Sequence, residues 1–486
     1  MAVLSQLEPH SVFSYFETIC SIPHPSGQEG KLADYLVSFA QERGLEYYRD
    51  HLNNVILIKN ASPGYEQEEA VILQGHLDMV CEQEPGRNID FSTQGLELSV
   101  EDGYVTANGT TLGGDDGIAV AMILALLDDD SLAHPRLEAV LTVSEEVGME
   151  GAAAIDLSML RGRKLLNLDS ENEGQIMVSC AGGCRVDCRL PLDRQTVTGQ
   201  LCTISVSGLT GGHSGVEIHK SRANACRVLN WVLVELGRQL SFSLVSFEGG
   251  NKDNAIPREA SAQIVLSSRL LPALSAALER CRKTLAAQHA ATDPELALNL
   301  TPQGQGSYEA LTVDCAQKAL LLIQYLPNGV QAMSQDIPDL VETSLNLGIV
   351  RTTPEELRLR FSVRSSVLAA KDALKEQLAQ ALTAVGGSVS FAGDYPPWEY
   401  RKDSPLREDL CRVYHKLTGA DPQLVAIHAG LECGLLSEKL PGMDAVSIGP
   451  NMEDIHTTAE RLEIASVQRT WDYLLQVLAL KHVSRR

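Results

Sequence analysis

Residues 141–150, LTVSEEVGME, place two adjacent glutamates where an apolar run ends and a glycine follows. Leu141 and Val143 belong to a run over residues 138–144 that predicts a buried strand, and Gly148 predicts the turn after it. A single Glu-Glu pair is most often only the polar end of a strand. Glu145 and Glu146 therefore become informative only if other strands of the chain end in the same way.

The composition indicates a multidomain globular protein. The chain has 486 residues, too many for one compact core, so we expect about two or three domains. Hydrophobic residues make up 44% and charged residues 21%, which is typical of a globular rather than a disordered chain. The net charge of −23 argues against nucleic-acid and anionic-membrane partners, because phosphate contacts need a surplus of Lys and Arg.

No segment of the sequence predicts a signal peptide or a membrane span. The N-terminal residues lack a sustained apolar region, and no window approaches ~18 consecutive apolar residues. The 11 cysteines are an odd number scattered along the chain, which favours reduced thiols in a cytoplasm. Cys180 and Cys184 are spaced somewhat like metal ligands, but no second pair with zinc-finger spacing follows, so we interpret them as structural thiols.

The first third of the chain alternates helical and extended patterns. Strands alternating with helices are typical of an α/β domain with a partly parallel sheet. The predicted helices cover residues 28–43 and 117–127, and the predicted strands cover residues 55–58, 71–73, 138–144 and 164–168.

The pattern changes near residue 185 and returns near residue 393. The intervening stretch predicts an α+β lid with strands at 201–206, 242–247, 356–363 and 388–391 and helices at 222–240 and 368–385. A helix at 405–418 and a strand at 445–448 then resume the first pattern. We therefore predict an α/β catalytic domain with a mixed, mostly parallel sheet flanked by helices. It would comprise residues 1–184 and 393–486, interrupted by a lid domain over residues 185–392.

Four further stretches place polar residues just beyond an apolar strand or beside a glycine turn. They are GHLDM (75–79), GGDDG (113–117), LDS (168–170) and DIHT (454–457). Each alone has an ordinary explanation as a turn or a strand end. Ligands of open α/β sheets bind beyond the carboxyl ends of the strands, so we expect the five stretches to converge on one crevice.

The residue types in these stretches favour a hydrolytic metal site. Two histidines and several carboxylates, with no thiolate, suit zinc or manganese. In HLD, alternate residues of an extended segment share one side, so Asp78 can orient His76.

The motifs HLDM, GTTLGGDDG, SEEVGMEG, NLDSE and a late histidine resemble, in order, those of the co-catalytic zinc metallopeptidases. That family includes carnosinases, carboxypeptidase G and bacterial dipeptidases. The stretches SIPHPSGQEG, GGHSGVEIH, NAIPREA, VETSLN and IHAGLECGL are most similar to its bacterial aminoacyl-histidine dipeptidases. The resemblance runs almost from end to end.

The resemblance implies a role for each matching residue. His76, Asp115 and Asp169 would hold one Zn²⁺, and His456, Glu146 and the bridging Asp115 would hold a second, with Co²⁺ or Mn²⁺ able to replace zinc. A cis peptide would join Asp115 to Asp116. Metal-activated water would attack the peptide bond, with Glu145 as general base and Asp78 orienting His76. In the lid, His213 would contact the substrate carbonyl, and Asn254, Arg364 and Gly430 would line the substrate site.

The resemblance also implies the substrate and the assembly. We expect a cytoplasmic dipeptidase acting on Xaa-His dipeptides such as carnosine, and a homodimer formed through the lids in which His213 reaches the partner's site. One motif departs from the family, since the late histidine lies in DIHTTAERL where relatives more often have His-Ser-Pro. The imidazole is kept, so only the loop packing around it is expected to differ.

Four other functions remain to be weighed. An N-acyl-amino-acid deacylase or a carboxypeptidase would use the same scaffold, and activity on β-Ala-His against N-acetyl amino acids separates them from a dipeptidase. A non-catalytic metal-binding or interaction protein is disfavoured because both the candidate base and every ligand type are present. Dinucleotide binding is disfavoured because no G-x-G-x-x-G occurs.

Overall fold

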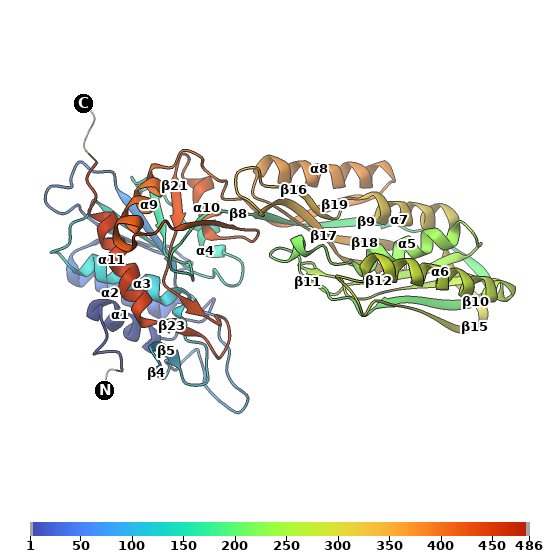
Figure 1. Cartoon of the computed structure of the whole chain (residues 1–486), viewed down its shortest axis with the longest axis horizontal. Coiled ribbons are helices and arrows are strands. Elements are labelled where there is room, and N and C mark those ends of the chain that lie inside the picture. Colours follow the sequence, from blue (N-terminus) through green and yellow to red (C-terminus); the bar gives the residue numbers. More distant parts are fainter. Residues whose placement is uncertain (1–2, 483–486) are drawn as a thin grey trace. The chain divides into compact units, whose positions relative to one another are not determined.

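The computed structural model describes residues 3–482, and the chain divides into two compact units. The first unit comprises Met1–Ser179, Tyr400–Ala426 and Glu432–Arg486, and the second comprises Cys180–Glu399 and Ile427–Leu431. The N-terminal and C-terminal segments, blue and red in Figure 1, together build the first unit.

The first unit contains an eight-stranded mixed sheet with helices packed on it. Its strand order is β1-β2-β6-β3-β7-β21-β8-β20. The strands are β1 (Glu46–Arg49), β2 (Val55–Lys59), β3 (Val71–His76), β6 (Leu137–Thr142), β7 (Lys164–Asn167), β8 (Gln175–Cys180), β20 (Gln423–Ile427) and β21 (Asp444–Ser447). The helices are α1 (His10–Ser21), α2 (Gly30–Arg43), α3 (Gly114–Asp128), α4 (Glu150–Ala154), α9 (Pro405–Thr418), α10 (Glu432–Lys439) and α11 (Ile464–Leu478).

The central strands of this sheet, β6, β3, β7 and β21, run parallel to one another. Strands β1 and β2 on one side and β8 on the other join antiparallel. Every residue of β2, β3 and β6 is buried, and this explains their nearly continuous apolar sequence. Helix α3 is apolar on all sides and buried from Gly114 to Leu127.

A small four-stranded sheet also belongs to the first unit. Its order is β22-β23-β5-β4, and it joins strands from distant parts of the chain. They are β4 (Leu98–Glu101), β5 (Tyr104–Ala107), β22 (Met452–Glu453) and β23 (Arg461–Glu463). Residues 454–460, between β22 and β23, contain His456.

The second unit is a nine-stranded antiparallel sheet with helices along one face (Figure 1). Its order is β15-β10-β14-β12-β17-β18-β9-β19, with β16 paired to β17. The strands are β9 (Gly182–Pro191), β10 (Arg194–Ser207), β12 (Ser243–Gly249), β14 (Ala260–Leu266), β15 (Ala297–Leu311), β16 (Gly329–Met333), β17 (Val341–Thr352), β18 (Glu356–Ser365) and β19 (Ser388–Tyr395). The helices are α5 (Ala225–Gly237), α6 (Leu271–His289), α7 (Val313–Tyr325) and α8 (Leu368–Ala384), and β11 (Gly212–His213) pairs with β13 (Ala255–Ile256) outside the sheet.

The predicted fold class is confirmed: a mixed, mostly parallel sheet with helices is accompanied by a separate antiparallel-sheet unit. The 11 cysteines all lie within the described residues, and none of them forms a disulfide. Among the described residues, no helix is long and apolar enough to cross a membrane.

Candidate active site

Three neighbouring parallel strands of the first unit end at the same edge of the sheet. His76 is the last residue of β3, Glu145 and Glu146 follow β6, and Asp169 lies just beyond β7. Strand β3 pairs with both β6 and β7, so the order of the strands brings these side chains together. The expected convergence at the carboxyl ends of strands is confirmed for these residues.

Asp115 enters the same region from an irregular turn at the start of α3. Gly113 has φ +67°, a conformation that favours glycine, and Asp115 departs from helical geometry. The expected cis peptide between Asp115 and Asp116 is present. Asp115 Oδ1 lies 3.0 Å from His76 Nε2, and its Oδ2 lies 3.0 Å from His456 Nε2. One carboxylate therefore stands between two imidazoles.

His456 comes from the loop between β22 and β23 and is the most exposed member of the cluster. Its side chain is 43% exposed and its φ is +60°, a rare value for a residue with a side chain. Its Nε2 lies 2.8 Å from Glu146 Oε1 as well as 3.0 Å from Asp115. Asp115, Glu146 and His456 thus offer ligand atoms within 4.8 Å of one another.

The other imidazole faces a second set of carboxylates. His76 Nε2 lies 3.0 Å from Asp115 Oδ1 and 3.5 Å from Asp169 Oδ1. Asp116, which the sequence singled out only for its cis peptide with Asp115, also groups with His76 and Asp169. Its Oδ2 accepts a hydrogen bond from the backbone N–H of His76. Asp116 therefore supports the end of β3 as well as adding negative charge.

The turn that carries the adjacent glutamates is held by buried side chains. The Asp78 carboxylate accepts the backbone N–H groups of Glu145 (2.9 Å) and Glu146 (3.2 Å). His76 Nδ1 lies 2.9 Å from the Asp78 main-chain oxygen and 3.5 Å from the Asp78 carboxylate. Glu29 accepts the N–H of Ser144 at 3.0 Å. Asp78 thus contacts both the imidazole that it was expected to orient and the turn of the predicted base.

The charges in the cluster shift one another's protonation. Burial acts against a charged His76, but the Asp169 and Asp115 carboxylates hold its pKa well above the usual value. Asp115 and Glu146 raise the pKa of His456 to about 10. Burial, with the charges of Asp169 and other nearby carboxylates, raises the pKa of Glu145. Several carboxylates therefore crowd one another around two imidazoles, and a divalent cation would neutralise part of this charge.

One buried carboxylate oxygen of the cluster has no hydrogen-bond partner. Asp116 Oδ1 is inaccessible to solvent and has no partner among the described residues, whereas the buried Glu146 Oε1 faces His456 Nε2, another candidate ligand, at 2.8 Å. A buried carboxylate oxygen without a donor is costly unless a cation approaches it. The donor set of imidazole nitrogens and carboxylate oxygens therefore fits zinc or a similar divalent metal.

The remaining predicted residues lie in the second unit. Gly215 brings two of them close, since a Cβ there would lie 2.9 Å from His213 Cε1 and 3.2 Å from Arg364 Nε. Arg364 Nη1 donates to the Tyr395 hydroxyl at 3.2 Å, and a Cβ on Gly430 would lie 2.7 Å from that ring.

Asn254 contacts the segment that carries His213. Its carbonyl accepts the N–H of Ser214 at 2.9 Å. The Nδ1 atom of His213 accepts the N–H groups of Gly215 and Val216, both at 3.2 Å, so the ring proton of a neutral His213 resides on Nε2. Burial and the Arg364 charge lower the pKa of His213, which favours this neutral form.

Sequence reasoning missed two buried polar residues near the predicted ones. His428, in the second unit, lies 2.7 Å from Ser344 Oγ through its Nε2, and burial with the Arg364 charge lowers its pKa to about 3. Glu432, in the first unit, accepts hydrogen bonds from Gln74 (2.5 Å) and Thr142 (2.6 Å), and burial raises its pKa to about 8. Both lie within the quoted IHAGLECGL motif, which was the available signal.

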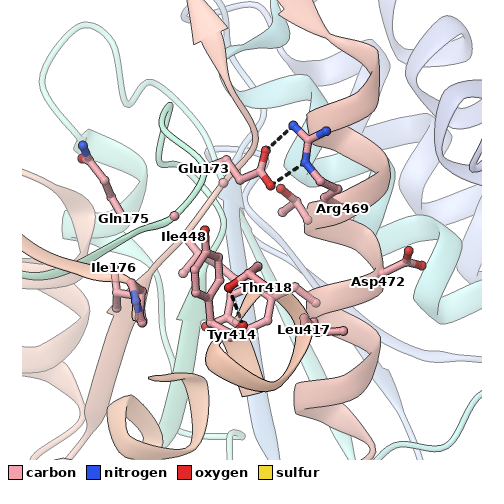
Figure 2. Close-up of a pocket in the computed structure, with 14 residues that line it drawn as sticks. Glu173, Gln175, Ile176, Tyr414, Leu417, Thr418, Ile448, Arg469 and Asp472 are labelled. Atoms are coloured by element: carbon pink, nitrogen blue, oxygen red, sulfur yellow. Dashed lines mark hydrogen bonds and ion pairs between the residues drawn. The ribbon is translucent and has the colours of Figure 1, made fainter. Parts of the chain in front are cut away.

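A separate pocket of about 200 Å³ lies between β8, α9 and α11 in the first unit (Figure 2). Tyr414, Leu417 and Ile448 supply apolar walls, and Arg469 forms a bidentate ion pair with Glu173 at its rim. None of the predicted site residues lines it. The cluster around Asp115 is therefore the better candidate for the active site.

The motifs and geometry of this cluster agree with a known family. Residues 72–480 match the model of peptidase family M20/M25/M40. The chain belongs to this family. The predicted membership in a metallopeptidase family is thereby confirmed, and the M20 match spans both units.

Individual relatives agree with the family over nearly the whole chain. The cytosol non-specific dipeptidase of Escherichia coli K12 is 37% identical over 480 residues, which cover 98% of this chain and 99% of the relative. The crystal structure of aminoacylhistidine dipeptidase from Vibrio alginolyticus is 33% identical, with a TM-score of 0.94 and 99% of both chains covered. Aminopeptidase PepT from Bacillus cereus, at 16% identity and a TM-score of 0.56, shares the fold.

Proposed function

We propose that the protein is a metal-dependent dipeptidase of the cytoplasm that hydrolyses Xaa-His dipeptides such as carnosine, and other dipeptides. The observation that carries the proposal is the Asp115 carboxylate, each of whose oxygens lies 3.0 Å from an imidazole nitrogen. The names of the Escherichia coli and Vibrio alginolyticus relatives support the substrate class, and the former's name supports the compartment.

The proposed metal ligands form two overlapping sets that share Asp115. His76, Asp115 and Asp169 would hold one zinc ion, and Asp115, Glu146 and His456 would hold the other, with cobalt or manganese able to replace zinc. When bound by these residues, two such ions would polarise the scissile carbonyl and increase the acidity of the attacking water. Support for the second set comes from its ligand atoms, which lie within 4.8 Å of one another.

Glu145 is the proposed general base. It would remove the proton of the attacking water and deliver it to the leaving amine. A carboxyl group whose pKa is raised by burial is a stronger base than an exposed one, and this favours the first transfer. Asp78 would hold the base in place, because its carboxylate accepts the backbone N–H of Glu145.

Residues of the second unit would bind the substrate. His213 carries its proton on Nε2 when neutral, so that atom can donate to the carbonyl oxygen as negative charge develops. Arg364 and Asn254 would bind the terminal carboxylate. Gly430 would leave room beside the Tyr395 ring, since a Cβ there would lie 2.7 Å from it. We further propose a homodimer formed through this unit, with His213 acting on the partner's site.

A substrate panel tests the proposed activity against its nearest alternative. The purified protein is assayed on β-Ala-His, on several α-dipeptides and on N-acetyl amino acids, before and after treatment with a chelator. We expect hydrolysis of dipeptides only, loss of activity with chelator, and recovery on adding zinc. Glu145→Gln measured in parallel controls for contaminating peptidases. Faster hydrolysis of N-acetyl amino acids would instead identify a deacylase.

A further inference from the structure

Glu460 is a buried carboxylate that the proposed mechanism does not use. It is 3% exposed and lies at the end of the loop between β22 and β23. Its neighbour Arg461 forms an ion pair with Glu453 rather than with Glu460, although a buried carboxylate usually needs a cationic partner. Its hydrogen bonds go instead to backbone amides.

The Glu460 carboxylate accepts from four consecutive backbone N–H groups. Oε2 accepts from Leu112 at 2.8 Å and Gly113 at 3.2 Å, and Oε1 accepts from Gly114 at 2.8 Å and Asp115 at 3.4 Å. Successive N–H groups that point to one place form a concave anion site, and here a side chain of the same protein occupies it. The turn that carries Asp115 is thus shaped around the Glu460 carboxylate.

The same loop also carries His456, four residues before Glu460. The loop is held internally, because Thr457 Oγ1 donates to Asp454 O at 2.7 Å and the N–H of Glu460 donates to Thr457 O at 3.2 Å. His456 in turn lies 3.0 Å from Asp115 Oδ2. Glu460 therefore fixes the distance between two segments that meet again at the Asp115–His456 contact.

Glycines make this close contact possible. Gly113 has φ +67°, and a Cβ on Gly114 would lie 3.3 Å from Glu460 Oε1. Side chains at these positions would strain the turn or push the carboxylate away from the amides. The sequence TTLGGDDG thus provides both the turn for Asp115 and the space for Glu460.

We propose that Glu460 is a positioning residue that holds Asp115 and His456 in the geometry required to bind the metal shared by Asp115, Glu146 and His456. The inference rests on the proposed metal centre and adds a residue to it. It predicts that loss of the carboxylate weakens this metal first, while the ion held by His76 and Asp169 is less affected. Supporting groups of this kind typically change metal affinity by about tenfold to a hundredfold.

Glu460→Gln is the main test, because it keeps the size of the side chain but replaces one oxygen with a nitrogen that cannot accept the N–H groups. Glu138→Gln is the matched control. Glu138 is also buried and accepts the backbone N–H groups of Arg161 and Gly162, although it has an additional ion pair with Arg136, and it lies in β6 away from the cluster. Both variants are expected to melt at lower temperature than the wild type.

The deciding readout is metal binding rather than activity. Zinc per chain is measured by elemental analysis after dialysis, and affinity by competition with a chromophoric chelator. We expect Glu460→Gln to lose one of two ions or bind it about tenfold to a hundredfold more weakly. Glu138→Gln should keep both. Excess zinc should restore turnover to Glu460→Gln but not to Glu145→Gln, since only the former retains its base.

Wild-type zinc affinity at both sites in Glu460→Gln would overturn the inference, as would equal metal loss in Glu138→Gln. If Glu460→Gln fails to fold, Glu460→Asp decides by the same measurement. It keeps the charge but withdraws it by one methylene, so wild-type affinity at both sites would again overturn the inference. A wild-type protein that binds no second metal would contradict the proposed centre itself, so the two failures are distinguishable.

Discussion

Glu145 and Glu146 are neighbours in the sequence, yet their different surroundings in the structure favour different roles. Glu146 Oε1 lies 2.8 Å from His456 Nε2, within the group that also contains Asp115. Glu145 groups with His76 and Glu146 rather than with Asp115 and His456, and burial raises the pKa of its carboxyl. The proposed division into base and ligand follows from this difference.

Replacing each glutamate with alanine separates base from ligand. Glu145→Ala should abolish turnover, a loss of at least about 10²-fold, and keep both metals, because Glu145 acts on water only. Glu146→Ala should lose activity together with one metal. Glu150→Ala, an exposed change at the start of α4, is the control and should leave both unchanged. Metal counts by elemental analysis check the prediction, and an empty site in Glu145→Ala would refute the assignment.

Metal affinity should fall as the pH is lowered. The pKa of His456 is about 10 and that of His76 is well above its usual value, so both imidazoles carry protons at neutral pH before metal binds. A ligand must lose its proton to bind, so acid competes with metal, by about tenfold per pH unit for each proton released. Zinc affinity measured between about pH 6 and pH 8 checks this. An affinity independent of pH would contradict it.

At the scale of elements, the turn after β6 is held from several sides at once. Asn54 Oδ1 accepts the N–H of Val143, and Gly151 lies directly against Val143 and Asn54. A Cβ on Gly151 would lie 2.2 Å from Val143 O and 2.5 Å from Asn54 Oδ1, closer than any real contact. The position of Glu145 and Glu146 therefore depends on a glycine in α4.

Gly151→Ala should displace the turn and destabilise the protein. Overpacking of this kind costs about 1–3 kcal/mol, so we expect a lower melting temperature together with reduced turnover. The control is Gly30→Ala in α2, where the nearest atom to an added Cβ is 3.8 Å away and an alanine suits a helix. Thermal unfolding and dipeptide hydrolysis of both variants check the prediction. Wild-type stability and activity in Gly151→Ala would contradict it.

The strands and the polar residues at their ends could be predicted from the sequence, because both depend on local patterns of residues. The predicted strand at 164–168 corresponds to β7, and the helix at 117–127 lies within α3. Strand β15 was not predicted, since Ala297–Leu311 contains a proline and glycines at an exposed edge and lacks a clear apolar alternation. The structural roles of Glu460 and Glu29 were not predicted either, because their carboxylates accept hydrogen bonds from backbone amides that are distant in sequence.

At the scale of the whole molecule, the division of the chain was predictable only in outline. The patterns predict a lid over residues 185–392, whereas the second unit comprises Cys180–Glu399 and also Ile427–Leu431. This segment of five residues is too short to show a change in composition along the sequence. It nevertheless contains His428 and Gly430, so part of the proposed substrate site is encoded within the C-terminal third of the sequence.

The proposed trans role of His213 predicts complementation between inactive variants. Glu145→Ala and His213→Ala should each be nearly inactive alone. In a mixed dimer with a two-fold axis, one site has both lesions and the other has neither, so random pairing should recover roughly a quarter of wild-type activity. Co-refolded mixtures assayed on β-Ala-His check this. No recovered activity, with mixed dimers present, would show that His213 acts within its own chain.

The central claim is a dipeptidase whose two metals share Asp115, and stepwise reconstitution tests it most directly. Zinc is added to metal-free wild type while bound metal and hydrolysis of β-Ala-His are followed together. We predict binding of two ions per chain, with full activity only when both are bound, and the loss of both binding and activity in Asp115→Ala. Full dipeptidase activity in the metal-free protein, or unchanged binding of two ions by Asp115→Ala, would contradict the claim.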